Sequence, residues 1–167
     1  CAGQSDYVIA SVPHAGRDDH RIEMQSIYNF KMVVVTPPEH SFANQEVVTG
    51  EQLCAQDLPI LLGPEGYLSR SVVKGIFSKA GKSLQLGMEN PDSNTRAALA
   101  RSGYGITIVH NDSVDPELWN GYPPLEDDDV ETGGEVVVAW RASDRAFGGP
   151  VVSSERHQHL VDCLRRS

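Results

Sequence analysis

The sequence predicts an α/β domain, in which helices alternate with the strands of a mixed or parallel sheet. Residues 58–109 read strand, helix, strand, helix, strand, because short apolar runs alternate with segments whose apolar residues recur at helical spacing. Residues 32–35, Met-Val-Val-Val, form an unbroken apolar run of the kind found in strands covered on both faces. A chain of 167 residues is also long enough to bury a sizeable core.

The first two predicted strands both end at prolines. Residues 6–11 are a short apolar run that stops before a proline, and we expect a polar loop over residues 14–21. Residues 30–36 form the second strand. Two consecutive prolines end it, because proline lacks the N–H that a sheet needs, and a loop is expected over residues 37–52.

The middle of the chain begins with a strand, a turn and a helix. Residues 58–62 are apolar and predict a strand, and Gly63-Pro64-Glu65-Gly66 predicts the turn that ends it. Residues 67–80 carry apolar residues at helical spacing. Gly81 is expected to end this helix, because glycine readily adopts the conformation that follows a helix.

A second helix lies between two further predicted strands. Residues 83–89 predict the first of these strands, and Asn90-Pro91-Asp92-Ser93 supplies side chains that can cap a helix over residues 94–102. Two glycines follow that helix. Residues 106–109 then return as a strand.

The last third of the chain contains one more predicted strand and helix. Residues 112–134 are acidic and rich in proline and glycine, which indicates an excursion over the surface. Residues 135–140 predict a strand, and residues 153–165 predict a terminal helix that a serine caps.

Charge and hydropathy narrow the classes of function. The chain has 14 Lys and Arg against 23 Asp and Glu, a net charge of -9, and binding to a phosphate backbone requires clustered cations. This chain should therefore not bind DNA by itself. Apolar runs such as residues 136–138 are far too short to cross a bilayer, so we expect no membrane contact.

The cysteines and the first residues indicate the compartment. Cys1, Cys54 and Cys163 are widely spaced and form no C-x-x-C, which suggests neither a disulfide framework nor a zinc site and fits the cytoplasm. The chain starts with cysteine instead of methionine, and no basic leader or apolar signal core precedes the first strand. We expect it to be part of a longer protein.

Four motifs, in this order, resemble the effector-binding domain of LysR-type transcriptional regulators. Residues 4–9 resemble the family's G-x-x-D-x-x-I strand, and residues 33–43 its crossover strand before a His-Pro-Leu-Ala box, with Ser-Phe in place of Pro-Leu. Residues 53–60 resemble the segment that enters the second lobe. Residues 99–109 resemble the family's helix, G-x-G turn and strand, with His110 where a proline is usual. The likeness extends over nearly the whole chain.

The resemblance implies a two-lobed fold like that of type 2 periplasmic binding proteins, with an incomplete first lobe. Residues 1–12 and 135–167 would be the remainder of that lobe (regulatory subdomain I), residues 13–34 the crossover or hinge, and residues 35–134 the second lobe (regulatory subdomain II). The family's linker helix and winged helix-turn-helix would precede Cys1. Within the family, Val-Val-Thr-Pro before a histidine-containing box resembles the regulators of sulfur assimilation.

A ligand is expected beyond the carboxyl ends of the strands, where helix N-termini present free N–H groups. Gly66 lets the backbone approach a ligand closely before the first long helix, and Tyr67 and Ser69 can donate hydrogen bonds there. Asp92 and Ser93 open the second helix. The resemblance adds two groups at strand ends, so the predicted effector-binding residues are Ser11, Thr36, Gly66, Tyr67, Ser69, Asp92 and Ser93.

Four of these residues also have a purely structural interpretation. Ser69 and Ser93 can be helix caps alone, and Gly66 can be only a turn residue. Thr36 precedes a proline and can be simply the end of a strand, because a residue in that position prefers the β region.

The favoured hypothesis is a sensor. A small, anionic effector would enter a cleft between the lobes, change their orientation and so alter DNA binding by the full-length protein through its helix-turn-helix. The resemblance also implies homo-oligomers. The alternative is the substrate-binding protein of a transporter, which shares the two-lobed architecture; the lack of a signal sequence and the histidine-containing box favour the regulator.

No motif supports catalysis, a cofactor or a bound metal. The cluster His14, Asp18, Asp19 and His20 has metal-ligand side chains, but a solvated loop is the favoured interpretation. Residues 126–129 are acidic without the spacing of a calcium loop. His157 and His159 would point to different faces of a helix.

Nucleophilic catalysis finds no support in the sequence either. There is no G-x-S-x-G and no phosphate loop, and Cys54 has no histidine beside it in the sequence. His40 and His110 could act as bases but match strand ends of the family. We expect no enzyme.

Overall fold

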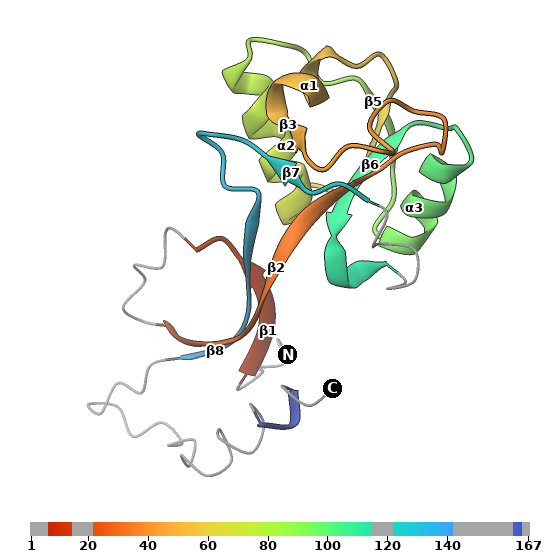
Figure 1. Ribbon diagram of the computed structural model, residues 1–167. Helices are drawn as coiled ribbons and strands as arrows, with labels where there is room; N and C mark the ends of the chain where they lie inside the picture. Colours follow the sequence, from red (N-terminus) through yellow and green to blue (C-terminus); the bar gives the residue numbers. More distant parts are fainter. Residues whose placement is uncertain (1–6, 15–21, 115–121, 142–161, 165–167) are drawn as a thin grey trace. The chain divides into compact units, whose positions relative to one another are not determined.

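The computed structural model describes residues 7–14, 22–114, 122–141 and 162–164 (Figure 1). The chain divides into two compact units, which we call unit 1 (Cys1–Asn29 and Gly134–Ser167) and unit 2 (Phe30–Gly133). Strand β2 (Ile22–Val35) belongs to both, since it begins in unit 1 and continues into unit 2. Within the described residues, no helix is both long and apolar enough to span a membrane.

Unit 1 contains an antiparallel pair of strands. Strand β1 (Tyr7–Val12) pairs with β8 (Gly133–Arg141), and β8 lies next to β2. Trp140 Nε1 donates a hydrogen bond of 2.9 Å to Glu23 Oε2. The strands predicted over residues 6–11 and 135–140 are confirmed.

Strand β2 is longer than the sequence predicted, because it starts at Ile22 and not at residue 30. Its first half mixes polar and apolar residues and has exposed or half-buried side chains. Only its last four residues, 32–35, form a continuous apolar run, and this run carries the sequence prediction of the strand.

Unit 2 is built on a mixed sheet with the strand order β2-β6-β4-β5. Strand β6 (Ile106–His110) runs antiparallel to β2 and parallel to β4 (Ile60–Leu62), which in turn runs parallel to β5 (Leu86–Glu89). Strand β5 is the outermost described strand, and all four of its residues are exposed. The predicted α/β alternation over residues 58–109 is confirmed.

Two helices connect the parallel strands. Helix α2 (Leu68–Lys79) joins β4 to β5, and helix α3 (Ser93–Arg101) joins β5 to β6. Figure 1 shows them on opposite sides of β6. Both were predicted to within a few residues, because their apolar spacing and their flanking glycines are clear in the sequence.

Helix α1 (Gly50–Ala55) lies where the sequence analysis expected a loop. Thr49 caps it in a reciprocal capping box: Gln52 N donates to Thr49 Oγ1 over 3.2 Å, and Thr49 N donates to Gln52 Oε1 over 2.9 Å. The pattern Thr-x-x-Gln is a helix-start signal that was overlooked, because the helix itself is too short to show a periodic apolar face.

Residues 112–134 are more than a surface excursion, which corrects the prediction. A short 3₁₀ helix η1 (Asn111–Ser113) is followed by Val114, which is buried. Strand β7 (Leu125–Glu126) pairs in parallel with β3 (Val48–Thr49), and Leu125 is also buried. Because the segment is mostly acidic, its sequence does not indicate that Val114 and Leu125 are buried. Residues 115–121 lie outside the described residues.

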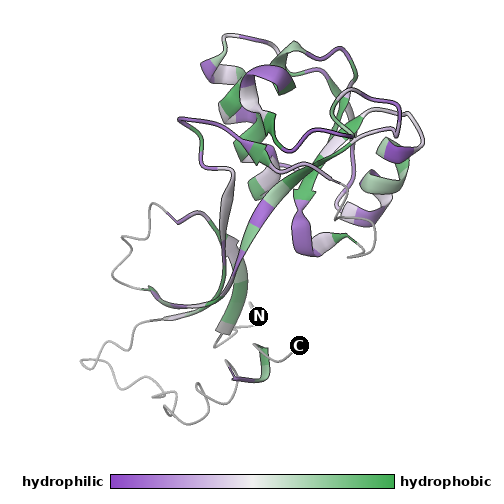
Figure 2. Ribbon diagram, in the orientation of Figure 1, coloured by the Kyte–Doolittle hydropathy of each residue, from purple (hydrophilic) through white to green (hydrophobic). Residues whose placement is uncertain are grey.

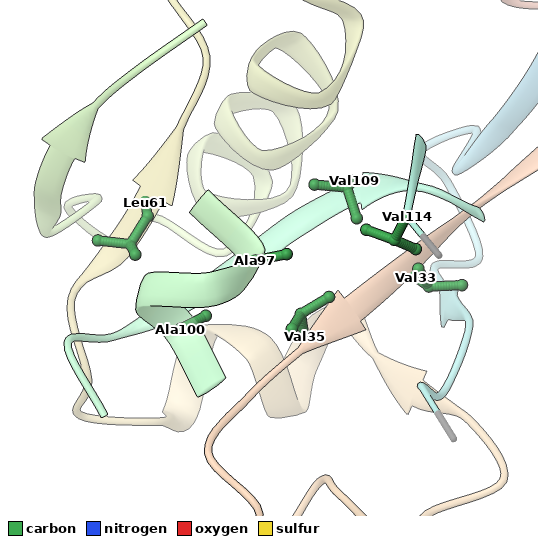
Figure 3. Close-up of a cluster of buried hydrophobic side chains, with 7 residues drawn as sticks. All are labelled: Val33, Val35, Leu61, Ala97, Ala100, Val109 and Val114. Carbon is green, nitrogen blue, oxygen red and sulfur yellow. The ribbon is translucent and has the colours of Figure 1, made fainter. Parts of the chain in front are cut away.

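The core of unit 2 covers both faces of its sheet. Figure 3 shows one face, where side chains of β2, β4 and β6 meet two alanines of α3, a cluster made of Val33, Val35, Leu61, Ala97, Ala100, Val109 and Val114. The alternate residues Met32, Val34 and Ile108 point to the other face and are also buried. Figure 2 shows hydrophobic residues along β2 and β6 in this unit.

The predicted terminal helix over residues 153–165 falls mostly outside the described part of the chain. Only residues 162–164 are described, and they are helical.

Candidate functional site

One edge of the unit 2 sheet gathers most of the predicted site residues. Strands β4, β5 and β6 run in the same direction, so their carboxyl ends lie at a single edge, where Gly63, Asn90 and Asn111 follow them. Helices α2 and α3 both begin there. We call this the carboxyl edge. It is the usual place for a ligand in an open α/β sheet, because strand ends and helix starts leave backbone groups unpaired.

The start of α2 has N–H donors that no described side chain caps. Gly66 adopts a φ of 90°, a left-handed conformation that suits glycine, and Tyr67 is the N-cap residue. The side chain of Tyr67 makes no capping hydrogen bond to the described first turn of the helix. Leu68, Ser69 and Arg70 are the first residues of α2, and their N–H groups lie at its positive end.

Tyr67 and Gly63 fit closely together. A Cβ atom built on Gly63 would lie 2.6 Å from Cδ1 of Tyr67, so the ring lies against the backbone of Gly63. Tyr67 is 41% exposed, whereas Ser69 is only 4% exposed. The ring of Tyr67 is therefore the accessible side chain at this helix start.

The start of α3 differs, because a carboxylate already caps it. Asp92 Oδ1 accepts hydrogen bonds from Asn94 N at 2.8 Å and from Thr95 N at 3.0 Å. The N-cap is thus Asp92, and Ser93 is the first helical residue. The sequence predicts free N–H groups for a ligand at both helix starts, but at α3 the Asp92 carboxylate uses two of them.

Arg70 is nearly buried and its charge is balanced. Its Nη1 donates to Gly63 O over 3.0 Å and forms an ion pair with Glu89 Oε2, and its Nη2 lies 3.0 Å from Glu65 Oε1. These contacts tie the first turn of α2 to the end of β5. Arg70 is therefore a structural link between two elements of the carboxyl edge.

Arg96 is more deeply buried, with 1% of its surface exposed. Its Nη1 donates to Asn90 O, its Nη2 donates to Ser93 Oγ over 3.1 Å, and its Nε is buried with no acceptor in the part of the chain that the structure describes. Burial lowers the pKa of the Arg96 guanidinium, and the nearby Tyr67 and Asp92 side chains act in the opposite direction.

His110 ends β6 and lies near Arg96. Its ring stacks on Phe30, with ring centroids 4.0 Å apart and planes inclined by 14°. Burial lowers the pKa of His110; the Asp112 carboxylate opposes this shift, and the charge of Arg96 adds to it. His110 is therefore neutral over a wider pH range than a solvent-exposed histidine.

The remaining predicted residues are Thr36 in unit 2 and Ser11 in unit 1. Thr36 follows β2, which runs antiparallel to β6 with Val35 opposite Thr107, so Thr36 lies at the opposite edge of the sheet and is buried. The predicted grouping of Thr36 with the helix starts is wrong, because the order of strands along the sequence does not show that β2 runs antiparallel to β6. Ser11 lies in β1 of unit 1 and is exposed.

The structure adds Arg96, His110 and Asn90 to this edge, none of which the sequence analysis placed in the site. Arg96 follows Ser93 by three residues, and that spacing puts two helical residues on one face. An arginine at this spacing from a predicted site residue was the signal available in the sequence.

The rival chemistries gain no support from the described residues. Asp18, Asp19 and His20 lie outside them, as do His157 and His159, and His14 Nδ1 lies 2.9 Å from Glu135 Oε1. No group of three or more metal-ligating side chains occurs in the described ranges. Asp127 accepts backbone hydrogen bonds from Asp129 and Val130, which makes it part of a loop structure.

A hollow of about 790 Å³ opens elsewhere on unit 2, between α1, the end of α2 and the acidic loop after β7. Its lining includes Cys54, Lys79 and Asp127. Lys79 is paired with Asp127 and Asp129, and burial raises the pKa of the Cys54 thiol, so neither group is prepared for ligand or nucleophilic chemistry.

Comparison with known proteins identifies a family and several relatives of this chain. The model of the LysR substrate binding domain family matches residues 1–166. A RuBisCO operon transcriptional regulator of Allochromatium vinosum is 24% identical over 113 residues, which are 68% of this chain and 36% of the regulator. The chain thus spans about a third of the length of this curated relative.

Solved structures share the fold. The regulatory domain of Synechocystis PCC6803 CcmR, in complex with 2-PG, has a TM-score of 0.70 and 18% identity to this chain. The match covers 98% of this chain and 73% of the CcmR chain. Reduced OxyR from N. meningitidis has a TM-score of 0.67 and 20% identity, with 97% of this chain and 70% of that chain covered.

Proposed function

Because the chain belongs to the LysR substrate binding domain family, we propose that it is the effector-sensing part of a longer transcriptional regulator. The family match extends over residues 1–166, and the curated relative is itself a transcriptional regulator. The same relative favours the regulator over the alternative, a substrate-binding protein of a transporter. The narrower resemblance to regulators of sulfur assimilation remains a prediction.

We propose that the effector binds at the carboxyl edge of unit 2. The observation that carries this proposal is the first turn of α2, which is left without a side-chain cap beside the left-handed Gly66. Backbone N–H groups in this position suit an electronegative group of a small molecule. Tyr67 and Ser69 would add side-chain contacts, whereas Asp92 and Ser93 would support the site from α3.

Sensing requires that the effector stabilises one conformation more than another. A ligand with equal affinity for two conformations changes neither population, so the contacts at the carboxyl edge would have to differ between the states. DNA binding would belong to another part of the full-length regulator, since this chain carries a net charge of -9. We further propose a homo-oligomeric, cytoplasmic protein that is not an enzyme.

Calorimetry of the purified chain against a broad panel of small carboxylates, phosphates, sulfate, amides and neutral metabolites tests the proposal. Saturable binding of at least one compound, with amide signals of Leu68, Ser69 and Arg70 shifting in NMR spectra, is the expected result. Binding that shifts no signal of the carboxyl edge would refute this location. A panel without any binding would refute the sensor itself.

The variant Ser69→Ala gives a second test at the same edge. Ser69 is almost completely buried at the first turn of α2, and alanine preserves the helix. We expect weaker effector binding with little change in the unfolding midpoint. Ser78→Ala is the matched control, because Ser78 lies in the last turn of the same helix and is exposed.

A further inference from the structure

The carboxyl edge contains a buried cation that no carboxylate of the described residues contacts. Arg96 is 1% exposed, and its hydrogen-bond partners are a carbonyl oxygen and a hydroxyl oxygen, Asn90 O and Ser93 Oγ. Its Nε finds no acceptor among the described residues. A buried charge is normally paired, because removing it from water is costly.

Arg70 shows what a balanced arginine looks like in the same place. Its guanidinium contacts two carboxylates, those of Glu65 and Glu89, although it is less deeply buried than Arg96. The two arginines thus differ in one respect that matters for ligand binding. Both arginines have a buried Nε without an acceptor in the described part of the chain, so the difference lies in the charge alone. The positive charge of Arg70 is already neutralised, whereas no described carboxylate contacts Arg96.

The Asp92 carboxylate favours the charged form of Arg96 only from a distance, since no ion pair joins the two among the described contacts. Asp92 is exposed, and its Oδ1 is hydrogen-bonded to two N–H groups of α3. His110, whose ring stacks on Phe30, has a pKa that the charge of Arg96 lowers further, so it supplies no negative charge to Arg96. Hydrogen bonds link Arg96 to the start of α2: its Nη1 donates to Asn90 O, and Asn90 N donates to Leu62 O over 3.0 Å. Leu62 precedes the glycine against which the ring of Tyr67 lies.

We propose that Arg96 is the charge partner of the effector, and that the effector is a small molecule whose anionic group, a carboxylate or a phosphate, binds at the first turn of α2. This inference rests on the proposed function. The uncapped N–H groups of α2 bind the anionic oxygens, and Arg96 supplies the full positive charge that a helix terminus lacks. Specificity for anions over neutral analogues then depends on one residue of α3.

A pair of isosteric probes tests this inference on the unaltered chain. Glycolate and glycolamide have nearly the same shape and differ in charge, and inorganic phosphate serves as a second anion. NMR titrations at constant ionic strength should show glycolate and phosphate shifting the amide signals of Leu68 to Arg70. Glycolamide should bind at least about tenfold more weakly, because it lacks the charge-assisted contacts.

Two substitutions of the same kind separate Arg96 from general charge effects. Arg96→Gln should weaken glycolate binding by about ten- to a hundredfold. Arg101→Gln removes the same charge from an exposed position of the same helix and should leave binding within about twofold. Arg96→Lys keeps the charge and should retain part of the affinity.

Stability measurements exclude a merely structural role. If Arg96 served only to hold Asn90 and Ser93, Arg96→Gln would unfold more easily in urea with and without phosphate. A charge partner predicts instead that phosphate stabilises the wild type and Arg101→Gln but not Arg96→Gln.

The outcomes are distinct from those of the proposed function. Equal binding of glycolate and glycolamide by the wild type, or equal glycolate affinity of Arg96→Gln and Arg101→Gln, would overturn the inference. The sensor would still stand if neutral compounds of the broad panel bound at the carboxyl edge. If Arg96→Gln did not fold, the comparison of the two probes on the wild type would decide.

Discussion

A single buried polar side chain can stabilise this fold when it makes a hydrogen bond. Thr107 is completely buried in β6, and its Oγ1 donates a hydrogen bond of 2.7 Å to Leu61 O in the neighbouring strand. The sequence around it, Ile-Thr-Ile-Val, predicts a strand but does not reveal this bond. Its hydroxyl links two strands of the sheet that ends at the candidate site.

Thr107→Val should destabilise the chain by about 1–2 kcal/mol. Valine has a similar shape, but it removes the donor that Leu61 O uses in a buried position. Urea unfolding measures the change. Thr95→Val is the control: Thr95 is exposed in α3, and we expect a change below about 0.5 kcal/mol there. Equal effects at both positions would contradict the role of this hydrogen bond.

His110 should make stability depend on pH. Burial lowers its pKa, so between the unfolded value of about 6.5 and the lower folded value the unfolded chain binds more protons. The stabilisation that depends on neutral His110 is therefore fully present above about pH 6.5. It is lost as the pH falls through the pKa that His110 has in the folded chain. His40 acts in the same direction, because burial lowers its pKa as well.

The measurement is the urea unfolding free energy between pH 7.5 and pH 5.5. Replacing His110 by glutamine should reduce the loss of stability over this interval, and replacing His40 as well should reduce it further. The carboxylates titrate in all variants and cancel in the comparison. An unchanged pH slope in both variants would show that neither histidine contributes.

At the level of the elements, the turn between α3 and β6 has the strictest geometry. Gly105 has a φ of 152°, and a Cβ atom there would lie 2.3 Å from the backbone oxygen of Pro59. Gly103 has a φ of 90°, but a Cβ atom there would meet no neighbour within 4 Å. Gly103 is therefore favoured only by its backbone conformation, whereas Gly105 is required both by its conformation and by its close contact with Pro59.

Gly105→Ala should destabilise the chain by about 3 kcal/mol or more, because the strand β4 would have to move as well as the turn. Gly103→Ala should cost only the local strain, about 1–2 kcal/mol. Thermal or urea unfolding of the two variants measures the difference. A larger effect at Gly103 would show that the contact with Pro59 is not what limits this turn.

The elements also show what the sequence could and could not predict. Helices α2 and α3 and strands β4 and β6 were found because their patterns are local. The capping box of Thr49 and Gln52 was local too, but α1 is short and was missed. The position of Thr36 could not be found in this way, because it depends on the pairing of β2 with a strand some seventy residues later in the chain, Val35 opposite Thr107.

The candidate site was predicted in part for the same reason. Gly66, Tyr67 and Asp92 are local turn and cap residues, and the structure brings them to one edge. Arg96 needed the structure, because its burial results from the packing of α3 against the sheet. The chemistry of a residue type is visible in a sequence, but its degree of burial is a property of the folded molecule.

On the scale of the whole molecule, amide hydrogen exchange should follow the division between core and helix starts. The amides of Val33 to Val35 and of Ile106 to Val109 are buried and paired and should exchange slowest. Leu68 to Arg70 should exchange quickly, because Tyr67 does not cap them. Asn94 and Thr95, which Asp92 caps, should be slower. Equal rates at the two helix starts would contradict the difference in capping.

The exposed outer strand β5 has a consequence for handling the protein. Leu86 and Met88 are 41% and 36% exposed, and an open strand of this kind can add a strand from another molecule. The net charge of -9 keeps molecules apart in dilute buffer. In about 1 M salt the screening length shrinks to about 3 Å, and this repulsion is lost. Adding salt should therefore cause precipitation, through contacts between molecules at β5, which is the strand of the unit 2 sheet farthest from β2.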